Sequence, residues 1–210
     1  MKIVVAMNAF KGSLTAQEAT SLVASGLRHG YREATVIEMP LADGGDGTVG
    51  VLTAALGGTM IPVTVTGPYG SPVVAEVGLA DLGKTAIIES AKASGLALVP
   101  EAQRDVRKAQ SRGVGELMLW AAERGCSRII VGIGGTAMND GGIGAVQAAG
   151  GIALDGKGCQ VVSGLAGLFE VSSVALGAIR GNCRVRRCQS NDRPGWRHQC
   201  VWASEGAFAG

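Results

Sequence analysis

Two glycine-rich segments of this sequence carry aspartates, and each follows a predicted strand and opens a predicted helix. The first is Pro40–Thr48, with the sequence PLADGGDGT, and the second is Ile129–Gly142, with the sequence IIVGIGGTAMNDGG. Glycines let the backbone approach a ligand closely, and N–H groups at a helix N-terminus attract anions. An aspartate beside them can bind Mg²⁺ or orient a hydroxyl. The combination predicts a phosphorylated ligand held next to a carboxylate, as phosphoryl transfer requires.

Within the first segment, Asp43 is the candidate Mg²⁺ ligand or hydroxyl-orienting group, and Gly44 and Gly45 are candidate phosphate contacts. An ordinary turn, in which Asp43 or Asp46 caps the next helix, is the alternative. The second segment matches neither standard nucleotide fingerprint, and a purely structural turn is its alternative. Its candidate phosphate-binding residues are Gly134, Gly135, Thr136, Asn139 and Asp140.

Two basic residues are candidates for gripping an anion. Lys11 follows the first predicted strand, at the carboxyl end where α/β sheets bind ligands, and Ser13 nearby can donate a hydroxyl. Arg112 stands at a predicted helix start, where the helix dipole disfavours a cation, so it is a candidate to grip a carboxylate. Ser111 before it is the expected N-cap and a further binding candidate. The alternatives are a solvated loop lysine and a surface arginine.

Two other residues leave their role open. Glu89 ends a predicted strand and is either functional or a solvent-facing carboxylate. Trp120 is expected in the core. The five cysteines have no metal-site spacing, so we expect no metal bound by cysteine.

The elements that position these residues alternate between strands and helices. We expect strands at 2–6, 34–38 and 128–133, and helices at 16–28 with Thr15 as N-cap, 47–56, 111–124 and 142–149. Between 60 and 89 three consecutive strands without helices predict a partly antiparallel sheet and a second module.

Composition supports a soluble α/β enzyme. Hydrophobic residues make up 47% of the 210 residues and aromatic residues only 4%, with 34 glycines, as in aliphatic strands joined by glycine turns. A net charge of +2 argues against nucleic acid or membrane as partner, and no apolar run is long enough to span a bilayer. The N-terminus is predicted to form a strand, without the features of a signal peptide, so we expect a cytoplasmic location.

In this order, the segments Ala9–Leu14, Ala42–Thr48, Val65–Pro68, Ser111–Glu116 and Gly132–Gly142 resemble those of the bacterial glycerate kinase family. The resemblance covers residues 1–160 approximately. It implies a two-domain α/β protein with one flavodoxin-like domain, Mg-ATP as phosphoryl donor and D-glycerate as acceptor. Lys11, Asp43 and Arg112 are then the candidate catalytic residues.

The sequence departs from the family at one site position. Where the family commonly has Pro-Asp-Ser, this chain has Met7-Asn8-Ala9, which puts a metal or hydroxyl role at Asn8 in doubt. We expect residues 1–59 to form the first part of the flavodoxin-like domain and 60–180 the second α/β domain. Oligomeric state and the choice of glycerate hydroxyl are not predicted.

From residue 181 the sequence shows no helical or strand periodicity, and we expect a disordered, aberrant tail. When codons are assigned to 186–190, 194–197 and 200–206 and shifted by one base, all three segments resemble the family's continuation. We therefore expect a C-terminal truncation by a frameshift near Arg180, and little or no kinase activity in this chain. A non-catalytic nucleotide- or anion-binding fragment, or an interaction protein using the basic tail, are the alternatives.

Overall fold

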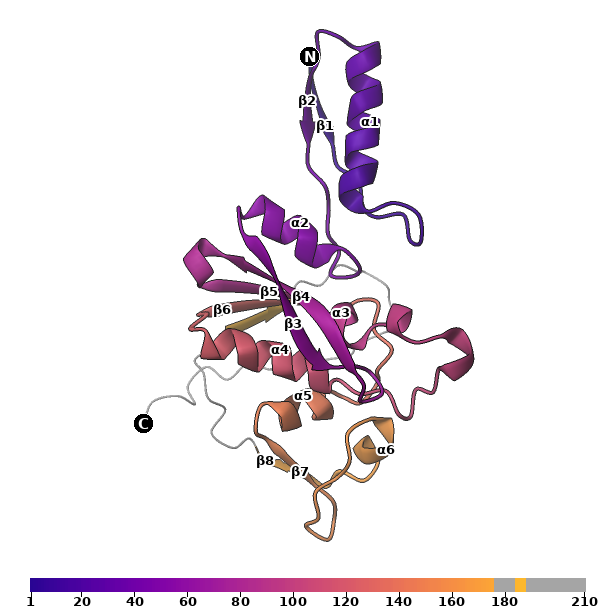
Figure 1. Ribbon diagram of the computed structural model, residues 1–210, viewed down its shortest axis with the longest axis vertical. Helices are drawn as coiled ribbons and strands as arrows, with labels where there is room; N and C mark the ends of the chain where they lie inside the picture. The colour runs from indigo at the N-terminus through magenta and orange to yellow at the C-terminus, as the bar shows by residue number, and fades with distance from the viewer. Residues whose placement is uncertain (176–183, 188–210) are drawn as a thin grey trace.

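The protein is an α/β protein in which parallel and mixed sheets are combined with helices (Figure 1). The structure, a computed structural model, describes residues 1–175 and 184–187, the latter four by their backbone. Its strands are β1 (Lys2–Val5), β2 (Thr35–Glu38), β3 (Thr59–Thr66), β4 (Pro72–Ala80), β5 (Thr85–Glu89), β6 (Arg128–Gly132), β7 (Ile152–Leu154), β8 (Ser173–Ala175) and β9 (Arg184–Arg187). Its α-helices are α1 (Ala16–Gly30), α2 (Thr48–Ala55), α3 (Ser90–Ser94), α4 (Arg112–Glu123), α5 (Ile143–Ala148) and α6 (Leu165–Leu168). Short 3-10 helices span Asp81–Gly83, Leu96–Leu98 and Glu101–Gln103.

The first βαβ unit projects from the rest of the molecule (Figure 1). Strands β1 and β2 pair in parallel, with α1 as the crossover between them. The expected N-cap is confirmed, because Thr15 and Glu18 form a reciprocal capping box at the start of α1. Val5 is buried on one face of the sheet, whereas Val4 and its register partner Ile37 are 56% and 39% exposed.

A mixed sheet of order β3-β4-β5-β6-β9 forms the centre of the molecule. Strands β3, β4 and β5 are antiparallel, and β5, β6 and β9 are parallel, which confirms the expected partly antiparallel sheet. Helix α2 covers one face and α4 the other (Figure 1). Successive residues of β5 alternate between these layers: Ile87 packs with Val49 of α2, and Ile88 packs with Leu117 of α4.

Two features bear on the expected domain division. Helix α2, which a boundary at residue 59 groups with β1 and β2, packs against the central sheet. Residues 184–187, expected to lie in a disordered tail, form β9 instead, because the open edge of β6 offers backbone hydrogen-bond partners regardless of side chains. The rest of that tail, with the proposed shift near Arg180, lies outside the described residues. The division itself stays a prediction.

A third, smaller layer follows the second glycine-rich segment. Strands β7 and β8 form an antiparallel pair, and Ile143 of α5 packs with Ala153 of β7 and Val161. This layer lies below the central sheet in Figure 1 and supports the helix that the second glycine-rich segment opens.

Candidate functional site

The first glycine turn, Asp43–Gly47, leads from β2 into α2. Asp43 accepts a hydrogen bond from the backbone N–H of Gly45 at 2.9 Å, so its carboxylate closes the turn on itself. Gly47, the residue before α2, has a φ of 88°, which favours glycine, and it offers no side chain to cap the helix. The alternative that an aspartate of this turn caps α2 is therefore wrong.

The second glycine turn, Gly132–Gly142, packs directly against the first. The backbone N–H of Gly134 donates to the carbonyl of Gly44 across 2.7 Å. A Cβ placed on Gly134 would lie 2.7 Å from the Cα of Gly45, and one on Gly132 would lie 2.8 Å from the carbonyl oxygen of Gly44. These contacts leave no room for a side chain, so glycine is required for the approach of one backbone to the other.

The loop after β1 completes this junction of the two turns. The side-chain amide of Asn8 donates to Oδ2 of Asp43 at 3.1 Å. The Gly45 N–H is the main cause that lowers the pKa of Asp43; the Asn8 amide and the positive charge of Lys11 lower it further. The structure thus brings Lys11 near Asp43, as expected if both serve one ligand, while Ser13 lies exposed in the same loop.

Asp140, at the far end of the second turn, is buried and hydrogen-bonded within the protein. Its Oδ2 accepts from the backbone N–H and hydroxyl of Ser111, at 2.8 and 2.9 Å, and from the N–H of Gly144 at 3.2 Å. Its Oδ1 accepts from the N–H of Gly142 at 3.1 Å. Both carboxylate oxygens are therefore engaged in joining α4 to α5, and this geometry favours a structural role for Asp140.

Ser111 stands at the N-cap position of α4, but its side chain does not cap that helix. Its hydroxyl instead donates to Asp140 and accepts from the backbone N–H of Ala145 in α5 at 2.9 Å. The expected side-chain cap is wrong, because a partner 34 residues away in sequence takes the hydroxyl.

Arg112 is held by a carboxylate of its own helix. Its Nε lies 3.1 Å from Oε1 of Glu116, whose oxygens also accept from the backbone N–H and hydroxyl of Thr66 at the end of β3. The arginine side chain remains 45% exposed. Glu116 therefore fixes the base of Arg112 while leaving much of its guanidinium accessible to an anion.

The middle of the second turn is tied to the segment after α3. Thr136 forms an isolated bridge with Gly95, and the carbonyl of Gly135 accepts from the N–H of Leu96 at 3.0 Å. Asn139 is exposed. Hydrogen bonding to residues 94–96 thus shapes the turn. The predicted phosphate-binding residues differ in exposure: Asn139 is exposed, Thr136 is partly buried beside Gly95, and Asp140 is buried.

The sequence left open whether the side chain of Glu89 is buried or faces solvent. It is 1% exposed, so the solvent-facing alternative is wrong, and it accepts a hydrogen bond from the N–H of Val49 in α2. Burial raises the pKa of Glu89. Its position at the carboxyl end of a strand marked it as a candidate site residue. Its burial depends on α2 packing over it, which the neighbouring sequence does not reveal.

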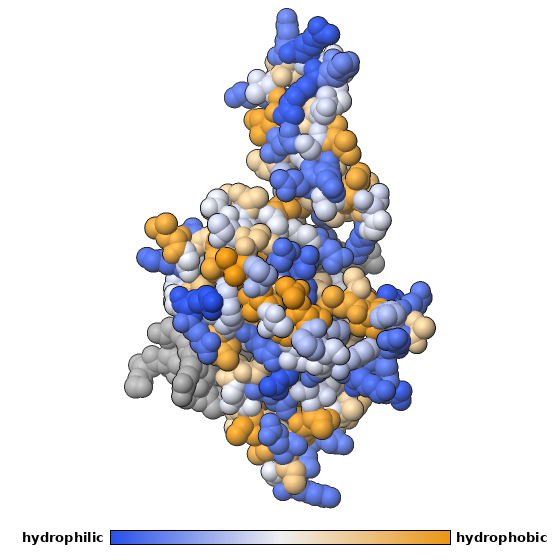
Figure 2. Space-filling view, in the orientation of Figure 1, coloured by the Kyte–Doolittle hydropathy of each residue, from blue (hydrophilic) through white to orange (hydrophobic). Residues whose placement is uncertain are grey.

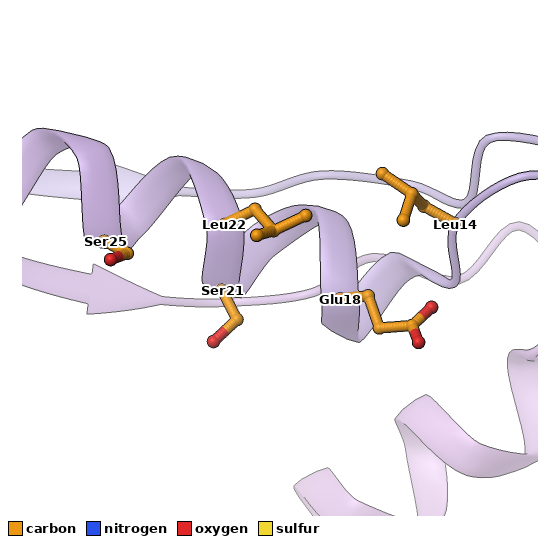
Figure 3. Close-up of a pocket in the computed structure, with 5 residues that line it drawn as sticks. All are labelled: Leu14, Glu18, Ser21, Leu22 and Ser25. Atoms are coloured by element: carbon orange, nitrogen blue, oxygen red, sulfur yellow. The ribbon is translucent and has the colours of Figure 1, made fainter.

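Two surface hollows lie away from the junction of the turns. One, of about 440 Å³, runs along α1 and is lined by the five residues in Figure 3: Leu14, Glu18, Ser21, Leu22 and Ser25. Another, of about 340 Å³, lies between α1, the residues after β2, and α2. Neither is lined by a predicted site residue. The candidate site therefore rests on the contacts between the turns.

The junction offers a magnesium ion the exposed carboxylate of Asp43. Mg²⁺ is commonly bound by one or two carboxylates together with substrate phosphates and waters. Asp43 supplies an exposed carboxylate, and no cluster of three or more His, Cys, Asp or Glu suited to a metal occurs among the described residues. This donor set suits an ion brought in with a phosphorylated ligand.

Together, these features define an α/β protein in which two glycine turns, a lysine and a carboxylate meet at one junction. Within residues 1–175 and 184–187 no helix is long and apolar enough to cross a membrane. The chain belongs to the glycerate kinase family, whose model matches residues 3–189.

Curated relatives carry the same family name. The chain is 42% identical to the "Glycerate kinase" of Bacillus subtilis over 88% of its own length and 48% of the relative. It is 44% identical to the "Glycerate 2-kinase" of Escherichia coli over 90% of its length and 49% of the relative. A crystal structure of a candidate glycerate kinase 2 from Salmonella typhimurium LT2 matches with a TM-score of 0.76 and 42% identity, over 88% of this chain and 51% of that one. The chain thus spans about half the length of these relatives.

Proposed function

We propose that this chain carries the part of a glycerate kinase that holds the phosphoryl groups, for transfer of the γ-phosphoryl group of Mg-ATP to a hydroxyl of D-glycerate. The observation that carries the proposal is the 2.7 Å contact between Gly134 and Gly44. It places two glycine-rich backbones, both leading into helices, beside Asp43. Glycine-rich turns that open helices are frequent anion sites. The N–H groups of Gly44, Gly45 and Gly134 bond within the protein, so the positive charge of Lys11 is the main attraction for an anion in this proposal.

In this proposal Asp43 and Lys11 act as a pair of opposite charges at the junction. The carboxylate of Asp43 is ionised at neutral pH, and its lowered pKa extends that state to more acidic pH, so it can accept a hydrogen bond from the glycerate hydroxyl. Lys11 supplies a compact positive charge for phosphate or carboxylate. Phosphoryl transfer mainly requires positioning and charge neutralisation of this kind.

Asp43 is also the residue that would hold Mg²⁺. The ion, when bound with ATP, supplies positive charge that offsets the charge of the phosphates. Asn8 keeps the hydrogen-bonding shape of an aspartate but adds no charge, so in this chain Asp43 carries the metal interaction without a second carboxylate at position 8.

Arg112 is proposed to grip the second anionic group, the glycerate carboxylate or a phosphate. Its support is the half-exposed guanidinium anchored by Glu116. We also propose a cytoplasmic location, where Mg-ATP is available as the phosphoryl donor.

The activity of the 210-residue chain by itself is a separate part of the proposal. We expect little or none, because the parallel β1–β2 pair has an exposed apolar face at Val4 and Ile37, and parallel sheets are normally covered on both faces. Figure 2 shows apolar residues at the surface of this N-terminal unit.

Three measurements on the purified chain test the proposal. A coupled assay for ADP with glycerate and Mg-ATP reports turnover, and phosphorus NMR of any product identifies the phosphorylated hydroxyl. Calorimetric titration with Mg-ATP reports binding without turnover. Rapid turnover would contradict the expected inactivity, and absence of Mg-ATP binding would contradict the assigned phosphate site.

A non-catalytic nucleotide- or anion-binding role is the second candidate. The observation favouring it is that both glycine turns and their contact lie within this chain. Mg-ATP binding that is unaffected by glycerate, with no ADP formed, would support it.

A further inference from the structure

Glu89 links the central sheet to the first glycine turn. It is the last residue of β5, and its Oε2 accepts a hydrogen bond from the backbone N–H of Val49 at 3.1 Å. Val49 lies in the first turn of α2, where backbone N–H groups have no partner inside the helix. Gly47 gives α2 no side-chain cap. The carboxylate from the neighbouring strand therefore takes the place of a cap.

The register of the sheet brings the second glycine turn to the same point. Glu89 pairs with Gly132, the last residue of β6. Gly132 in turn lies against Gly44, since a Cβ on it would come within 2.8 Å of the Gly44 carbonyl oxygen. Glu89, at the end of β5, thus holds α2, and its register partner Gly132 contacts the first glycine turn itself.

The charge of Glu89 suits this position. A carboxylate near a helix N-terminus is stabilised by the helix dipole and by hydrogen bonds from backbone N–H groups. Two charged side chains face it: Lys92 of α3, which favours its ionised form, and Asp46 of the first turn, which opposes it. The side chain is almost fully buried, and this burial is the main cause that raises its pKa, but it also means that solvent offers no competing partner for the Val49 N–H.

We infer that Glu89 is a positioning residue, which caps α2 from the adjacent strand and thereby fixes the Asp43–Gly47 turn against the Gly132–Gly135 turn. It acts through Asp43 and the turn backbone. Its relevance to phosphoryl transfer rests on the proposed function, whereas the anchoring of the turn does not.

Hydrogen exchange by mass spectrometry on the whole chain tests the anchoring. Glu89→Gln keeps the size and an acceptor oxygen but removes the charge, and Glu89→Ala removes both. We expect the peptide covering 44–52 to exchange about tenfold faster or more in Glu89→Gln, because the acceptor of the Val49 N–H is no longer charged, and faster still in Glu89→Ala, where the hydrogen bond is lost altogether. Peptides from β3 and β4 should keep their protection.

Glu76→Gln is the matched control. Glu76 is a half-exposed carboxylate on the neighbouring strand β4, and it lies 3.8 Å from the same Lys92. Neutralising it should leave the exchange of 44–52 unchanged. If Glu89→Ala loses protection throughout the sheet, the exchange of 44–52 in the isosteric Glu89→Gln is the test instead.

A pH series separates positioning by charge from simple packing. In the wild type, protection of 44–52, corrected for the intrinsic pH dependence of exchange, should fall as acid protonates Glu89. Glu89→Gln should show no such fall, and Asp46→Asn should retain it. Equal exchange of 44–52 in wild type and Glu89→Gln, within about twofold at every pH, would overturn the inference.

Calorimetric titration of the same variants with Mg-ATP keeps the two proposals distinct. Weaker binding in Glu89→Gln, together with faster exchange, supports both. Faster exchange in a chain whose wild type binds no Mg-ATP supports the positioning role and contradicts the phosphate site. Unchanged exchange with intact Mg-ATP binding contradicts the positioning role alone.

Discussion

The side-chain amide of Asn8 donates a hydrogen bond to Oδ2 of Asp43, 35 residues further along the chain. The contact joins the loop after β1 to the first glycine turn. The Gly45 N–H is the main cause that keeps the pKa of Asp43 below its usual value, and the Asn8 amide and the charge of Lys11 lower it further. A carboxylate with a lowered pKa in the folded state stabilises the fold above its unfolded-state pKa, and that contribution disappears as pH falls through the folded-state pKa.

Replacing Asn8 by aspartate should reverse this effect. Asn8→Asp removes the donor and places a second carboxylate beside Asp43, so the pair should titrate in two steps, with the upper pKa raised by the like charge. The pH window in which the contribution of Asp43 is lost then moves upward. Carbon-detected NMR titration of the carboxyl groups measures this. Asn8→Ala, which only removes the donor, should give a smaller rise; equal titration of Asp43 in all three proteins would contradict the prediction.

Asp43 and Lys11 should matter for ligand binding more than for folding. Asp43→Asn and Lys11→Ala each remove one charge from an exposed position, so the free energy of unfolding should change by only about 0.5 kcal/mol. Calorimetry should show Mg-ATP binding weakened about tenfold or more. Lys108→Ala, at an exposed lysine outside the junction, is the control. Wild-type affinity in both site variants would refute their assigned roles.

Gly134→Ala should damage the contact between the turns. The added Cβ would sit 2.7 Å from the Cα of Gly45, a backbone atom that cannot rotate away. We expect a loss of about 1–3 kcal/mol in the free energy of unfolding and weaker Mg-ATP binding. Gly50→Ala, inside α2 with open space around its Cα, should instead stabilise the protein by about 0.5–1 kcal/mol. Urea denaturation followed by circular dichroism measures both, and similar values for the two would contradict this account.

Asp140→Asn should destabilise the protein strongly. The substitution keeps the shape but turns one buried acceptor oxygen into an NH₂ group that faces N–H donors of Ser111, Gly142 and Gly144. The expected loss is about 2–4 kcal/mol. Asp155→Asn is a suitable comparison, because Asp155 also accepts from two backbone N–H groups but at an exposed turn. Chemical denaturation should show a loss of about 1 kcal/mol or less there; a loss as small at Asp140 would argue against the structural role.

The exposed face of the β1–β2 pair should promote association of the chain. Val4→Thr together with Ile37→Thr reduces this apolar surface, and light scattering should show less aggregation with stability changed by only about 0.5 kcal/mol. Val5→Thr, on the buried face, should cost about 1–3 kcal/mol. Undiminished aggregation of the double variant would show that another surface is responsible.

Local sequence was sufficient where the relevant interaction is local. Thr15 was expected as the N-cap because it precedes a helical segment, and the structure confirms it and adds Glu18, three residues on, as the other half of a capping box. The strands and helices around the two glycine turns were likewise expected close to their observed bounds, because aliphatic runs and glycine turns alternate along the chain.

Side-chain roles that depend on distant partners could not be predicted in this way. Ser111 has the sequence position of an N-cap, yet Asp140 and Ala145 take its hydroxyl. Glu89 resembles a surface carboxylate until α2 packs over the end of β5. The proximity of Lys11 to Asp43 was expected only in outline, from the rule that strand carboxyl ends gather ligand-binding loops.

The contact of Gly44 with Gly134 also sets the order in which this protein can fold. The two residues are about 90 positions apart, so closing the intervening loop costs chain entropy that only the assembled sheet can offset. During synthesis, at about 5–20 residues per second, the first turn leaves the ribosome several seconds before its partner exists. During that interval the nascent chain contains Asp43 and the glycines of the first turn, but the second turn that packs against them has not yet been made.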